Sequence, residues 1–166
     1  MPGIFVDIQN ELTDIEREVG MLSDAVSLYA KGSKDDPAWV WVVVQGLASG
    51  VEKVYSGCER VMAMIAADID ATPVSHHDGW HAALLSRVAQ AFPGVRGAVI
   101  SEQTYQALDL LRSFRHRHRN SYGLTLDAEI VVDRAQQASF AFAHFKRDVT
   151  DFGESFEVRS SGPGPR

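Results

Sequence analysis

The sequence has one cysteine, no long apolar run and no overall excess of positive charge, and each shortage excludes a class of protein. Cys58 has no second cysteine with which to form an intramolecular disulfide, so a cytoplasmic protein with a packed thiol is expected. The most apolar run, AWVWVVVQGLASGV, is too short and too interrupted to span a membrane, which needs about 20 apolar residues. A formal net charge of −6 argues against broad nonspecific nucleic-acid binding, although a local basic site remains compatible with it.

The pattern of a β-strand is also missing, because no run of alternating apolar and polar residues separates turn signals. Apolar residues instead recur at spacings of three and four, which predicts an all-α fold. Two long helices joined by the polar segment KGSKDDP are expected to form an antiparallel hairpin. Gly32 suits the end of the first helix, Asp36 can cap the second, and Pro37 fits its first turn.

Three further helices follow from the same spacing. The third is expected to begin near Ser75, the fourth after a Ser101 cap, and the fifth after an Asp127 cap. The length fits a single helical domain over residues 1–155, followed by a disordered tail over residues 156–166. The expected apolar positions of the fifth helix are Ile130, Phe142, Phe145, Val149 and Phe152.

Positive charge is gathered in one short segment, FRHRHRNSYG, at the end of the fourth helix. A helix C-terminus favours cations, but this accounts for only one or two arginines. The remaining charge needs phosphates, carboxylates of a partner, or acids elsewhere in the fold, and we favour a ligand or partner. The basic residues are Arg112, Arg115, His116, Arg117, His118 and Arg119.

These residue types suit cleavage of RNA by its own 2′-hydroxyl. On an ideal helix Arg115, Arg119 and Tyr122 share a face, and His118 lies beside them. Arginine binds phosphate through a planar fork of donors, whereas histidine exchanges protons near neutral pH. Such a reaction needs neither a metal nor another cofactor, and none is expected. The candidate phosphate-binding residues are Arg112, Arg115, Arg117 and Arg119.

A second group of histidines lies in SHHDGWH, where His77 and His81 are four residues apart. They could face one metal ion from a helix, but no third ligand is identifiable. A helix start with polar residues in its first turn is the preferred interpretation.

From about residue 75 onward the sequence resembles the HepT-like members of the HEPN superfamily, which are all-helical RNase toxins of toxin–antitoxin pairs. The matching stretches are GWHAALLSRVAQAFPGVRGAVIS and LDLLRSFRHRHRNSYGLTLD. The family signature is an arginine followed after four to six residues by a histidine, with a tyrosine two positions later. With Tyr122 as the anchor, Arg115 matches the arginine and Asn120 stands at the histidine position. The register of Arg112 and His118 places Asn120 at the tyrosine and is less favoured.

Asn120 conflicts with the family mechanism because an amide cannot transfer a proton near neutral pH. Three explanations remain open. The residue is a deliberate change that disarms a toxin, or a natural variant in which His116 or His118 supplies the imidazole, or the mark of a protein that binds without catalysis.

The resemblance also implies partners. In HepT-type pairs a minimal nucleotidyltransferase antitoxin transfers AMP to the tyrosine, which would be Tyr122 here. HEPN proteins usually form homodimers whose motif helices line one cleft. Positions 115 and 120 diverge by about 140° on an ideal helix, which agrees with a site completed by a second copy. The implied function is therefore that of an RNase toxin that acts on RNA. The alternatives are a noncatalytic HEPN dimer and an antitoxin for an active nucleotidyltransferase.

Overall fold

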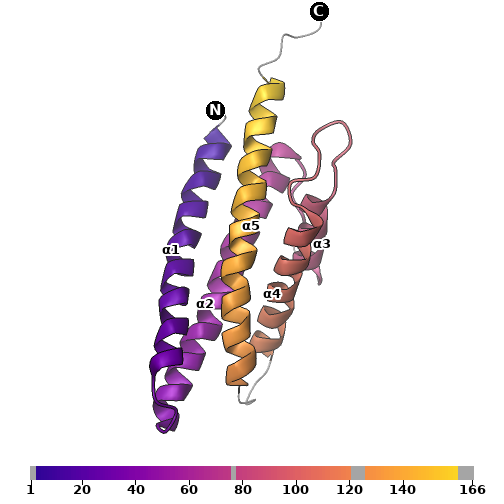
Figure 1. Cartoon of the computed structure of the whole chain (residues 1–166). Coiled ribbons are helices and arrows are strands. Elements are labelled where there is room, and N and C mark those ends of the chain that lie inside the picture. The colour runs from indigo at the N-terminus through magenta and orange to yellow at the C-terminus, as the bar shows by residue number, and fades with distance from the viewer. Residues whose placement is uncertain (1–2, 76–77, 121–125, 161–166) are drawn as a thin grey trace, which may run out of the picture.

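The computed structural model describes residues 3–75, 78–120 and 126–160. Over these residues the chain forms five α-helices and no strand, so the expected all-α fold is confirmed (Figure 1). A π-helical turn, η1 (Ile65–Ile69), continues the second helix. The α-helices are α1 (Gly3–Lys31), α2 (Pro37–Met64), α3 (Trp80–Ala89), α4 (Glu102–Asn120) and α5 (Ala128–Ser160).

The long helices lie side by side in an elongated bundle. Helix α5 packs against α1, α2 and α4, while the short α3 packs against α2 and α4 (Figure 1). Apolar side chains from all five helices form one core, which includes Cys58. Burial raises the pKa of the Cys58 thiol, so this residue behaves as a packed apolar group.

The expected α1–α2 hairpin is confirmed in detail. The Asp36 carboxylate accepts hydrogen bonds from the backbone N–H groups of Ala38 and Trp39, which caps α2. Farther along α2, Gly57 lies against α1. A Cβ atom there would be 2.4 Å from Ile15 Cγ1, so glycine permits the two helices to approach closely.

Three expectations about the helices need correction. Ile130 is 49% exposed, and Val131 is buried in its place. Val131 follows the spacing that leads to Phe142, and Ile130 lies about 100° away around the helix. Helix α3 begins at Trp80 and not near Ser75, because Gly79 adopts a left-handed conformation with φ of 83°. Helix α5 continues to Ser160, so residues 156–160 are helical and not part of a disordered tail.

The connection between α3 and α4 is fastened by a buried ion pair. Arg96 donates from Nε to Asp70 Oδ1 at 2.6 Å and from Nη2 to Asp70 Oδ2 at 2.9 Å. It also donates to the carbonyl oxygens of Gln90, Gly97 and Arg87. This segment therefore fixes the position of α4 relative to α3, and the candidate site below uses both helices.

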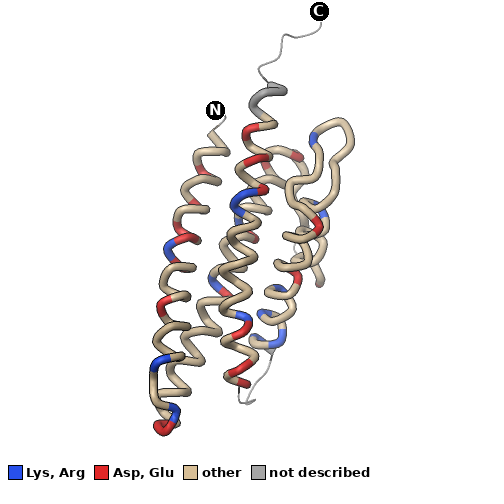
Figure 2. Tube along the Cα trace, in the orientation of Figure 1, with Lys and Arg blue, Asp and Glu red and all other residues tan. Residues whose placement is uncertain are grey.

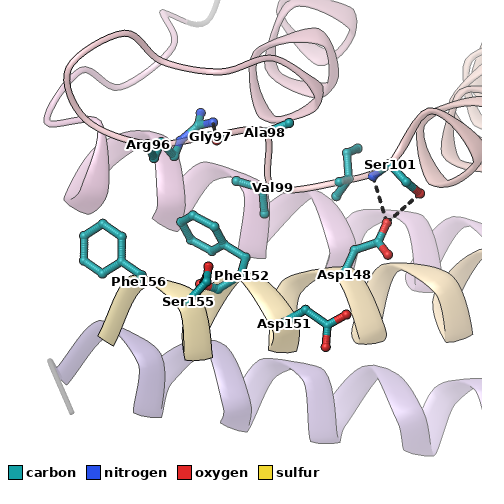
Figure 3. Close-up of a pocket in the computed structure, with 11 residues that line it drawn as sticks. Arg96, Gly97, Ala98, Val99, Ser101, Asp148, Asp151, Phe152, Ser155 and Phe156 are labelled. Atoms are coloured by element: carbon teal, nitrogen blue, oxygen red, sulfur yellow. Dashed lines mark hydrogen bonds between the residues drawn. The ribbon is translucent and has the colours of Figure 1, made fainter. Parts of the chain in front are cut away.

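The start of α4 is held from α5. Ser101 caps α4 as expected, because its Oγ accepts a hydrogen bond from the Thr104 N–H. Asp148 in turn accepts hydrogen bonds from the Ser101 N–H and Oγ, both at 2.8 Å (Figure 3). It also accepts one from Thr104 Oγ1 at 2.6 Å. Ser101 and Asp148 border a pocket of about 420 Å³ between the α3–α4 connection and α5. The pocket lies at the opposite end of α4 from the basic segment, and the whole helix is about 28 Å long.

Replacing Asp148 with Asn is expected to lower the free energy of unfolding by about 1–2 kcal/mol at pH 7, because charge-assisted hydrogen bonds become neutral ones. Burial raises the pKa of Asp148, but the hydrogen bonds from Ser101 and Thr104 outweigh it and bring the pKa below its ordinary value. The stabilisation is therefore present above the ordinary aspartate pKa of about 4, and it is lost as the pH falls through the lower, folded-state pKa. Urea unfolding of both proteins from pH 7 down to pH 2 measures this.

Asp151→Asn is the matched control, since Asp151 is an exposed carboxylate on the same helix. The difference between Asp148→Asn and the unchanged protein should shrink in acid. A difference that is constant over the whole pH range would contradict the account.

Candidate functional site

The basic end of α4 faces two acids on α2. Figure 2 shows Lys and Arg gathered over the last turns of α4, where the chain passes towards α5. Arg115 Nη1 lies 3.5 Å from Glu59 Oε1, and Arg119 Nε lies 3.6 Å from Glu52 Oε2. The two glutamates are two helical turns apart, so they share one face of α2. Acids elsewhere in the fold thus compensate part of the charge, whereas the sequence favoured a ligand or partner.

Arg115 is the most enclosed of the basic residues in the last turns of α4. Its side chain is only 11% exposed, and its guanidinium carbon lies 5.7 Å from the centre of the buried Tyr55 ring. Burial and the nearby Glu59 carboxylate raise the pKa of Tyr55, so this residue remains a neutral phenol. Among the described residues, no group accepts a hydrogen bond from the buried Arg115 Nε. Arg115 is therefore fixed in place while part of its donor set remains unused.

A histidine from α3 joins this cluster. His81 Nδ1 lies 2.5 Å from Glu59 Oε2 and 3.3 Å from Arg115 Nη1. The His81 ring also packs against Trp80, with ring centres 4.2 Å apart. The sequence assigned His81 only to a helix start or a weak metal site. Nothing in the spacing links it to Arg115, which lies 34 residues later.

A second imidazole is held in the same way on α4 itself. His118 Nδ1 lies 2.8 Å from Glu52 Oε1, and its ring stacks on Phe114 at 6.0 Å with an interplanar angle of 4°. Glu52 and Glu59 lie about 10 Å apart along α2. The site therefore contains two carboxylate–imidazole pairs, and Arg115 contacts the pair formed by Glu59 and His81.

The other predicted residues have different surroundings. Arg112 Nε donates to Asp109 Oδ1 at 2.7 Å within α4. His116 and Arg117 are exposed on α4. Asn120 is the last residue of α4. Tyr122 and His77 lie outside the described residues, so their predicted roles stay predictions.

Two further observations bear on the kind of site. No three His, Cys, Asp or Glu side chains in the described ranges are grouped as metal ligands. None of the helices in these ranges combines the length and apolarity that a bilayer span requires. A pocket of about 500 Å³ is lined by Glu52 and Arg119. Its walls carry further acidic and basic side chains, and the basic ones include Arg17, Lys53 and Arg60.

The helical bundle and the basic end of α4 define a HEPN-type protein. The family model described as HepT-like protein matches residues 46–156, which is most of the chain, and the chain belongs to this family. The match begins within α2, so the segment that carries Glu52 and Glu59 is part of it. Comparisons with curated proteins and with solved structures give no significant match.

Proposed function

We propose that this protein is an RNase toxin that cleaves RNA without a metal ion and that Arg115 is the centre of its active site. The observation that supports this most strongly is the way Arg115 is held. One 3.5 Å contact ties it to Glu59, beside two imidazoles that are oriented by carboxylates. A guanidinium has five N–H donors, so a phosphate can be bound by those that remain.

In the proposed reaction the 2′-oxygen of RNA attacks the adjacent phosphorus and the 5′-oxygen leaves. Arg115 stabilises the negative charge that develops on the phosphoryl oxygens, and the more exposed Arg119 assists. Asn120 cannot transfer the proton, so an imidazole must do so. His118 is favoured over His116, because Glu52 orients it and it lies on the side of α4 that faces α2.

The test is incubation of the full-length protein with RNA in EDTA, followed by analysis of the RNA ends. We expect products with 2′,3′-cyclic phosphate and 5′-hydroxyl ends. His118→Ala should lower the rate about 100-fold, which is the usual loss for one acid–base group. His144→Ala is the matched control, since His144 packs against Phe140 on α5. RNA binding without any cleavage would favour the noncatalytic HEPN dimer instead.

The proposal extends to the partners. A second copy would bring a second basic helix to the cleft, and a polyanion such as RNA would relieve the repulsion between the two.

A minimal nucleotidyltransferase antitoxin would transfer AMP to Tyr122. The added phosphate, close in sequence to Arg115 and Arg119, would then compete for the site of the RNA. The intact mass of the protein after incubation with the transferase and ATP measures this transfer. Tyr122→Phe is the control. Growth on expression of each gene alone separates the toxin from the antitoxin role.

A further inference from the structure

We propose that His81 of α3, which lies outside the motif helix, is the general base of the cleavage reaction, with His118 as the general acid. This inference rests on the proposed RNA cleavage. In this proposal His81 takes the proton-transfer role that Asn120 cannot fill, because an amide does not transfer protons near neutral pH.

The His81 ring is oriented so that its Nε2 atom can accept a proton. Arg115 has only donors, and the closer partner of His81 Nδ1 is the Glu59 carboxylate at 2.5 Å. Nδ1 therefore carries the proton and donates it to Glu59, while Arg115 directs its N–H to the other carboxylate oxygen. The opposite nitrogen, Nε2, then accepts a proton, as in other sites where a carboxylate fixes the tautomer of a catalytic histidine.

The His81 ring is also accessible at the protein surface. The Glu59 side chain is 8% exposed, whereas the His81 side chain is 33% exposed. The orienting carboxylate is thus buried behind the ring, and the ring itself reaches the surface. A group that only fastens helices together gains nothing from this accessibility, but a group that meets a substrate requires it.

The two imidazoles are held by two carboxylates on one face of α2. Displacement at phosphorus needs a base at the attacking oxygen and an acid at the leaving oxygen, on opposite sides of the phosphate. Glu59 holds His81 and Glu52 holds His118, two turns apart on one face of α2. Arg115 contacts the first pair and precedes His118 by three residues on α4, so a phosphate bound by Arg115 would lie near both imidazoles.

The cleavage step needs no reactant besides the RNA and the two imidazoles. His81 Nε2 takes the proton of the 2′-hydroxyl as the 2′-oxygen bonds to phosphorus. The bond from phosphorus to the 5′-oxygen breaks, and that oxygen takes a proton from protonated His118. The products are a 2′,3′-cyclic phosphate and a 5′-hydroxyl, and both imidazoles return to their starting forms by proton exchange with water.

The experiment measures RNA cleavage in EDTA by the full chain, by His81→Ala and by His81→Gln. The Gln side chain keeps an N–H donor for Glu59 but cannot accept a proton. We expect both variants to lose about 100-fold in rate. Added imidazole should restore part of the activity of His81→Ala, because the deleted ring leaves a space beside Glu59. Glu59→Gln serves as the positioning variant and should lose activity that imidazole does not restore.

Binding of an RNA with 2′-deoxy linkages, which cannot be cut, should change less than about threefold in both His81 variants, since a lost proton-transfer group affects the reaction and not binding. His144→Ala again controls for loss of a histidine. His81→Ala or His81→Gln that cuts at the original rate would overturn this inference and leave the proposed function intact. Lost cleavage with lost RNA binding and no rescue by imidazole would show a structural role and would also overturn it. An unchanged protein that cuts no RNA would overturn both.

Discussion

Replacing Arg115 with Ala is expected to lower RNA cleavage in EDTA by about 100–1,000-fold, which is the usual loss when one donor to the developing charge is removed. The reason is geometric. Arg115 is the motif residue that Glu59, Tyr55 and His81 together hold in one place. Arg115→Lys keeps the charge but lacks the planar fork, so it should retain only a small part of the activity. First-order rates on one defined RNA provide the measurement.

Arg147→Ala is the matched control, because Arg147 is an exposed arginine on α5 outside the site. Circular dichroism must show that each variant is folded, since loss of Arg115 removes one of the partners of the buried Glu59 carboxylate. An Arg115→Ala protein that is folded and cuts at the original rate would exclude Arg115 from the active site.

The second large effect concerns stability. Asp70→Ala is expected to lower the free energy of unfolding by about 3–5 kcal/mol, because it leaves the Arg96 guanidinium buried without its carboxylate. Both side chains of this pair are completely buried. A change of this size lowers the melting temperature by roughly 6–20 °C in a protein of this length. Thermal and urea unfolding measure it.

A double variant separates the loss of stability due to the missing ion pair from the loss due to one buried charge without a partner. Asp70→Leu with Arg96→Met removes both charges, and it should be closer in stability to the unchanged protein than Asp70→Ala is. Asp14→Ala is the surface control, since Asp14 and Arg17 are both well exposed, and its effect should stay below about 1 kcal/mol. Equal losses for Asp70→Ala and Asp14→Ala would contradict the structural role given to Arg96.

Most of the fold could be predicted from local chemistry. Apolar residues at helical spacing fixed the buried faces of α1 and α2, and a side-chain cap at Asp36 located the turn between them. The prediction was wrong where two neighbouring apolar residues compete, as Ile130 and Val131 do. It was also wrong where the conformation of one glycine sets a boundary, as at Gly79 before α3.

The site was less predictable, because its contacts join residues far apart in the chain. The basic segment is evident in the sequence. The acids that face it lie on α2, and Glu59 precedes its partner Arg115 by 56 residues. Glu52 and Glu59 were not predicted as site residues, although their spacing of seven residues places them on one face of a helix. His81 and the Asp70–Arg96 pair gave no local signal, since each acquires its role only when the helices pack.

The most direct test of the account compares RNA cleavage in EDTA by the unchanged chain, by Asn120→His and by Asn120→His combined with Arg115→Ala. The account predicts that the unchanged chain already cuts RNA, because His81 and His118 carry the protons, and that the combined variant does not. Cleavage by Asn120→His alone would contradict it and would show a disarmed RNase whose proton-transfer group belongs at position 120. If none of the three cuts RNA, the chain is a noncatalytic member of its family.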